Sequence, residues 1–132
     1  MMRKNISSGA AWEATVGYSR AVRIGSLIEV AGTTAVDERG AVVGPDDPYV
    51  QARYALEKIG RALADAGAGF ENVIRTRMFV TDIARWEEVG RAHGEVFRDI
   101  RPAATLVQVA SLVRGDLLVE IEATALVPED SL

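Results

Sequence analysis

One stretch near the C-terminal end constrains the fold of this chain more than any other. Residues 101–126 read RPAATLVQVASLVRGDLLVEIEATAL, and two runs rich in Val, Leu, Ile and Thr flank the turn-forming residues Arg114-Gly115-Asp116. Because strands combine β-branched residues with flanking turn residues, we predict one strand over 104–109 and another over 117–126.

Period-2 alternation divides the second of these strands into an apolar face and a mixed face. The apolar face consists of Leu117, Val119, Ile121, Ala123 and Ala125. The mixed face carries Glu120 and Glu122 in mid-strand. Burying two carboxylates is costly unless they meet water, a cation or hydrogen-bond donors. That face is therefore either solvated or part of a functional site.

Length and composition narrow the class of protein. At 132 residues the chain is predicted to form a single domain, 1–132, around one core. A net charge of -4 and a pI of about 5.0 disfavour binding to nucleic acid or to an anionic membrane. The sequence shows neither a run of about 18 apolar residues nor an N-terminal secretory signal, so we expect a cytoplasmic protein.

The scarcity of certain residue types excludes several chemistries. Without cysteine there is no thiol nucleophile, disulfide or thiolate metal site. His93 is the only histidine, and it lies on the apolar stripe of a predicted helix, which favours a partly buried packing role. Lys58 occupies a polar helical position, so we expect no desolvated lysine nucleophile. The sequence predicts neither a metal nor a cofactor, and leaves arginine, carboxylate, hydroxyl and backbone chemistry.

The remaining patterns predict an α+β fold. We expect an edge strand near 2–6, a hairpin of strands 18–24 and 27–33, a helix over 48–66, a strand over 72–81 and a helix over 82–98. This order is typical of a mixed β-sheet with two helices packed on one face.

Charged residues recur on the predicted helix-free face of the sheet, among apolar ones. They are Glu29, Arg75, Arg77, Glu120 and Glu122. Such a mixture on an uncovered face favours an oligomer interface. The alternative is a solvated sheet with ordinary cross-strand ion pairs, each contributing little.

Several motifs together resemble the Rid family (reactive intermediate deaminases, also called the YjgF family). They are the hairpin containing Tyr18, the strand VIRTRMFVTD, and RPAATLVQVA followed by VEIEATAL; the likeness spans residues 16–126. The resemblance implies a chorismate-mutase-like α+β domain assembled as a homotrimer, with clefts for a small-molecule metabolite between subunits. It also implies hydrolysis of reactive 2-imino or enamine acids to 2-keto acids and ammonia without a cofactor.

Carried over position by position, the family's site is only partly present. Ala104 stands where deaminating members carry the arginine that holds the substrate carboxylate. Leu106 replaces a cysteine or similar small residue, and Ala31 replaces a serine. Gly90 matches an asparagine of the second helix.

Two family positions are retained. The resemblance implies that the ring of Tyr18 lines the pocket and that Glu122 positions the attacking water.

The arginine missing at Ala104 would be a serious loss for a carboxylate substrate. Losing a charged hydrogen-bonding partner typically costs about 1.5 to 3 kcal/mol, or roughly 10- to 150-fold in affinity. Five other arginines are candidates to bind the substrate carboxylate in its place: Arg20, Arg75, Arg77, Arg91 and Arg101. The alternative for Arg75 and Arg77 is pairing with Glu120 and Glu122, and for Arg20 and Arg91 it is a solvated surface charge.

Two functional hypotheses remain open from the sequence. The first is a cofactor-free, deaminase-like hydrolase acting on a small imine or enamine. The second is a trimeric small-molecule-binding protein without turnover, which Ala104 favours. Ribonuclease activity finds no support, because the charge balance is acidic and only one histidine is available for acid-base chemistry.

Overall fold

The computed structural model describes residues 2–128. Its strands are β1 (Arg3–Ile6), β2 (Ala21–Ile24), β3 (Leu27–Thr33), β4 (Val73–Val80), β5 (Ala103–Gln108) and β6 (Val119–Leu126). Its helices are α1 (Ala11–Val16), α2 (Pro48–Asp65) and α3 (Trp86–Phe97), with 3-10 helices η1 (Phe70–Asn72) and η2 (Ile83–Arg85). Among these residues, none of the helices combines the length and apolarity that a membrane crossing needs.

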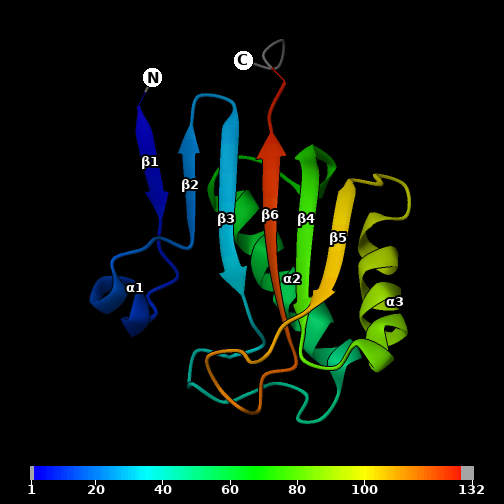
Figure 1. The fold of residues 1–132 in the computed structure, drawn as a ribbon. Coiled ribbons are helices and arrows are strands. Elements are labelled where there is room, and N and C mark those ends of the chain that lie inside the picture. The colour runs from blue at the N-terminus through cyan, green and yellow to red at the C-terminus, as the bar shows by residue number, and fades with distance from the viewer. Residues whose placement is uncertain (1, 129–132) are drawn as a thin grey trace.

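The strands form one six-stranded sheet in the order β1-β2-β3-β6-β4-β5. β4 and β5 run parallel, because α3 carries the chain back between them, and the other neighbours are antiparallel. Figure 1 shows α2 and α3 on the same side of the sheet, with the opposite side open. The predicted α+β class, with a mixed sheet and helices on one face, is confirmed.

Side-chain chemistry fixes both ends of α2. Asp47 precedes the helix and accepts a hydrogen bond from the Val50 amide at 3.0 Å, while Pro48 occupies the first helical turn. At the other end, the Arg23 guanidinium donates to the Ala66 carbonyl at 2.7 Å. Because these groups satisfy backbone atoms that a helix leaves unpaired, α2 begins and ends where the sequence predicts.

The core lies between α2, α3 and the covered face of the sheet. Its largest fully buried apolar side chains are Phe97, Ile28, Leu56, Ile59, Leu63, Leu117, Ile121, Val80, Val89 and Val119. Phe97 also meets the Phe70 ring edge-on, with centroids 5.4 Å apart. Burying a side chain of this size contributes about 1.5–3 kcal/mol, so this layer is the main source of stability.

Irregularities in two strands change which side chains are buried. A register shift between Val73 and Arg75 leaves Val73 3% exposed and Ile74 49% exposed, the reverse of strict alternation. A second shift, between Val30 and Thr33, buries Thr33 on the helix side. Strict period-2 alternation would place Ile74 on the covered face with Thr76, and Thr33 on the uncovered face with Glu29. Both expectations are wrong, because a bulge adds a residue and puts the residues on its two sides out of step.

Local structure differs from the prediction at two further points. Residues 11–16 form α1, in a segment where we predicted neither a helix nor a strand. Asp82 caps η2, not α3: its carboxylate accepts from the Ala84 amide at 3.0 Å, and α3 begins only at Trp86. A short 3-10 turn therefore precedes the helix that was predicted to start at residue 82.

Candidate functional site

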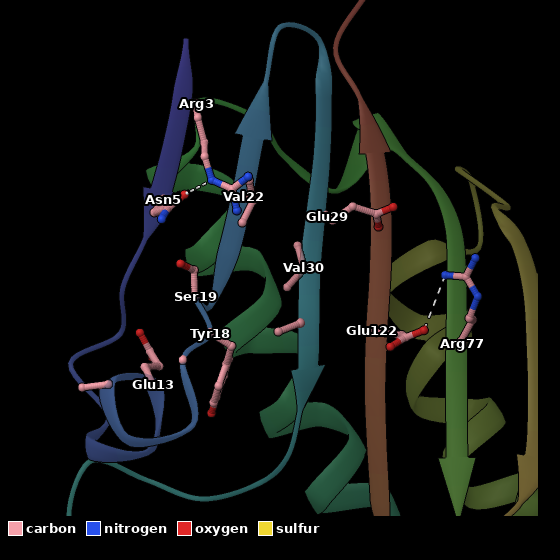
Figure 2. Close-up of a pocket in the computed structure, with 13 residues that line it drawn as sticks. Arg3, Asn5, Glu13, Tyr18, Ser19, Val22, Glu29, Val30, Arg77 and Glu122 are labelled. Atoms are coloured by element: carbon pink, nitrogen blue, oxygen red, sulfur yellow. Dashed lines mark hydrogen bonds and ion pairs between the residues drawn. The ribbon is translucent and has the colours of Figure 1, made fainter.

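A hollow lies on the uncovered face of the sheet (Figure 2). Four residues from the predicted site line it: Tyr18 after α1, Ala31 on β3, Arg77 on β4 and Glu122 on β6. The other polar side chains along it are Arg3, Asn5, Glu13, Ser19 and Glu29. Its volume of about 750 Å³ falls within the range of roughly 300–1,000 Å³ that small-molecule sites occupy.

Arg77 and Glu122 face each other across neighbouring strands. They are register partners on β4 and β6, and Arg77 Nη1 lies 3.6 Å from Glu122 Oε1, as Figure 2 shows. Their side chains are 40% and 34% exposed, so the pair contributes little to stability. Because a guanidinium carries five donors, Arg77 keeps N–H groups with which to bind an anion in the hollow.

Glu120 is a second acid close to this pair, two residues before Glu122 on β6. Burial raises the pKa of its carboxyl above the usual value, and the charge of Glu122 adds to this effect, while Arg20 opposes it. Alternation placed both acids on one face, but depth separates them: Glu120 is half-buried and Glu122 is paired with Arg77. Two neighbouring carboxyls in different environments suit an acid-base site.

Arg20 is not the solvated surface charge that the sequence left open. Only 8% of it is exposed, and its Nη2 donates to the Gly32 carbonyl at 2.6 Å. The guanidinium carbon lies 5.7 Å from the centroid of the Tyr18 ring. Arg20 therefore lies next to Tyr18 but does not line the hollow.

The remaining predicted positions lie elsewhere in the subunit. Ala104 and Leu106 are on β5, at the edge of the sheet opposite β1. Leu106 packs against the core, and Gly90 lies in α3. Within one chain, these three residues do not meet the hollow.

Arg91 also lies away from the hollow. Its guanidinium stacks on Tyr49, with 3.9 Å between the guanidinium carbon and the ring centroid. A hydrogen bond from the Tyr49 hydroxyl to Glu95 continues this contact between α2 and α3. Of the candidate replacement arginines, Arg77 alone lines the hollow.

His93 has the packing role that its position predicts. Its Nε2 lies 2.8 Å from Thr76 Oγ1, and its ring centroid lies 4.7 Å from that of Phe97. Burial lowers the pKa of the imidazole, which favours the neutral ring. Within residues 2–128, no group of three or more His, Asp or Glu gathers to hold a metal ion.

Lys58 differs from the sequence-based expectation of a solvated lysine. Its ammonium donates to the carbonyls of Thr34 and Val36 at 2.8 and 2.9 Å. Burial, and then the charges of Arg20 and Arg61, lower the pKa of Lys58 to about 8. Lys58 does lie in α2, but the loop after β3 covers its ammonium.

We expect the Lys58 ammonium to lose its proton near pH 8 in the folded protein. Titration of the side-chain carbon resonances by NMR measures this, with Lys4→Arg and Lys58→Arg variants to assign the signals. Since the folded pKa lies below the ordinary 10.5, the unfolded chain holds more protons between these values and stability rises with pH in that window. A Lys58 signal that stays constant until above pH 10 would contradict this.

Comparison with known proteins identifies the family. The family model described as "Endoribonuclease L-PSP" matches residues 8–127. The mouse protein named 2-iminobutanoate/2-iminopropanoate deaminase is 34% identical over 125 residues, which cover 95% of this chain and 92% of that protein. The chain belongs to the Rid/YjgF family.

Solved structures of the Rid/YjgF family share the fold. Rv2704 from Mycobacterium tuberculosis is 50% identical, with a TM-score of 0.87 over 96% of this chain and 100% of that one. TdcF from E. coli, solved with bound serine, is 26% identical, with a TM-score of 0.78 over 94% of each chain. The chorismate-mutase-like fold expected from the resemblance is therefore the observed one.

Proposed function

We propose that this Rid/YjgF chain is a cofactor-free hydrolase that cleaves the C=N bond of a small imine or enamine carrying a carboxylate. The observation that carries the proposal is that Tyr18, Arg77 and Glu122 share one hollow, and that the half-buried Glu120 is close enough to Glu122 on β6 to feel its charge. The names of the mouse deaminase and of serine-bound TdcF support a substrate of amino-acid size.

Arg77 binds the substrate carboxylate in this proposal and replaces the arginine absent at Ala104. It approaches from β4, whereas Ala104 lies on β5. A guanidinium suits a carboxylate from any direction in which its fork converges. Tyr18 shapes the wall of the hollow and contacts the apolar part of the substrate.

The two acids divide the work of hydrolysis. Glu122, held beside Arg77, orients water toward the imine carbon, and Glu120 accepts the proton that the water loses on attack. The water oxygen bonds to the carbon of the imine, which enters protonated on nitrogen, and the C=N π electrons move to nitrogen to give a carbinolamine. Glu120 then returns its proton to the amine, the C–N bond breaks as the hydroxyl proton passes to Glu120, and the products are a carbonyl compound and ammonia; Glu120 releases this last proton to solvent. A carboxyl with a raised pKa suits this exchange near neutral pH.

We also propose a homotrimer in which a neighbouring subunit completes each site. The open face of the sheet, with its mixed charged and apolar side chains, supports an interface there. Gly90, Ala104 and Leu106 would then close the hollow from the neighbour, and their small or apolar side chains leave room for the substrate's side chain. A native mass of three 14.2 kDa chains is the expected measurement.

The direct test is release of ammonia and a 2-keto acid from freshly generated 2-imino acids. We expect the purified protein to accelerate both above the spontaneous rate, in equal amounts, without added metal or cofactor. Saturable binding of a substrate analogue without product would favour the second hypothesis, a binding protein, for which the apolar Ala104 is the supporting feature. Neither binding nor turnover in the intact oligomer would overturn the proposal.

A further inference from the structure

The Glu120 carboxylate lies directly against the backbone of Gly32. A Cβ added to Gly32 would lie 2.9 Å from Glu120 Cδ and closer still to Oε2. Gly32 is not among the residues with a positive φ, so its conformation does not require glycine. The glycine therefore provides space for the carboxylate and no special backbone geometry.

Arg20 holds the same glycine through its carbonyl. Its Nη2 donates to the Gly32 oxygen at 2.6 Å, and within residues 2–128 its buried Nε has no hydrogen-bond partner. Removal from water strengthens the field of a charge, because little solvent remains to screen it. The Arg20 cation is thus placed to act on Glu120, because both groups contact Gly32.

The charges around this group differ in sign. Glu120 experiences the positive charge of Arg20 and the negative charge of Glu122, whose own partner is Arg77. Arg20 itself is close to two further charges, the carboxylate of Glu13 on α1 and the ammonium of Lys58 on α2. Removing Arg20 therefore leaves Glu120 with a negative neighbour and without its balancing cation.

We infer that Gly32 and Arg20 are positioning residues for Glu120: Gly32 leaves the space that its carboxylate occupies, and Arg20 supplies the buried cation that stabilises its ionised form. Their part in hydrolysis rests on the proposed function. The position of the Glu120 carboxylate and the effect of the Arg20 cation on it are independent of the proposed function, and both can be measured on a protein without any activity.

Gly32→Ala tests the first half. The new methyl group collides with the end of a flexible side chain, so Glu120 moves aside and the free energy of unfolding in urea should change little. Because a displacement of about 1 Å can cost up to 10²-fold in rate, we expect the hydrolysis rate to fall at least about 10-fold. In Glu120→Gln, adding Gly32→Ala should lower the rate no further. Gly94→Ala is the matched control, since a Cβ there meets no heavy atom within 4 Å.

Arg20→Gln tests the second half without any assay of turnover. NMR of side-chain carboxyl carbons, with Glu120 assigned through Glu120→Gln, should show the Glu120 titration at higher pH in Arg20→Gln than in the natural chain. Gly32→Ala provides the same spectroscopic readout if the buried arginine proves necessary for folding, and should also move the Glu120 resonance. An unchanged Glu120 titration in folded Arg20→Gln, or an unchanged Glu120 resonance in Gly32→Ala, would overturn the inference. Shifted signals in a natural chain without hydrolysis would uphold it and refute the proposed function alone.

Discussion

Replacing Glu120 by glutamine is expected to lower kcat/KM for imine hydrolysis by about 10²- to 10⁴-fold, the usual contribution of a positioned acid-base group. The amide keeps the shape of the side chain but cannot accept the proton of the attacking water. Because burial and Glu122 raise the pKa of the natural Glu120 carboxyl, its removal costs little stability and the variant should fold. Ammonia release under subsaturating substrate measures the effect.

The pH dependence of the natural chain provides a second readout of the same residue. Because the pKa of Glu120 is raised, its carboxylate becomes protonated at a higher pH than that of an ordinary glutamate. The fall of kcat/KM on the acid side should therefore lie above the usual carboxyl range. Glu57→Gln, on an exposed position of α2, is the control and should leave rate and profile unchanged. Full activity in folded Glu120→Gln would exclude the assigned role.

Replacing Arg77 by glutamine is expected to weaken binding of carboxylate substrates by about 10- to 150-fold, corresponding to a lost charged hydrogen bond of about 1.5–3 kcal/mol. The loss should appear mainly in KM, since the guanidinium binds a group that does not react. The effect on an imine without a carboxylate should be small, and this comparison separates substrate binding from disturbance of Glu122.

Arg75→Gln is the matched control for Arg77. Arg75 lies on the same strand, but its guanidinium donates to Thr105 Oγ1 at 2.6 Å and it is not among the residues lining the hollow. Both variants remove one positive charge from β4, so a long-range electrostatic effect would lower binding in both. Equal losses in Arg75→Gln and Arg77→Gln would refute a specific clamp at Arg77.

Membership in the Rid/YjgF family does not by itself settle the chemistry of this chain. The chain is similar to proteins whose names indicate imine deamination, yet the resemblance implies that Ala104 stands in the place of their carboxylate-binding arginine. An Ala104→Arg variant would add the cation back from β5. In the proposed function Arg77 takes this role, because it lines the hollow from β4.

The sequence by itself determined the strands, the two long helices, their order and the covered face of the sheet. Alternation in β6 and the helical stripe of α2 carry strong period-2 and period-3.6 signals, and Asp47 and Pro48 mark the start of α2 locally. It also placed Glu120, Glu122, Arg75 and Arg77 on one face. These features follow from near neighbours in the chain, so periodicity is sufficient to predict them.

Only the tertiary structure decided which charged residues are buried and which share the hollow. Arg20 and Lys58 have polar neighbours in sequence, but contacts with β3 and the loop that follows it remove them from water. Glu120 and Glu122 occupy equivalent positions in the period-2 alternation of β6. The Glu120 carboxylate nevertheless packs against the backbone of Gly32, whereas Glu122 pairs with Arg77. Depth and ion pairing depend on segments far apart in the chain, which local periodicity does not report.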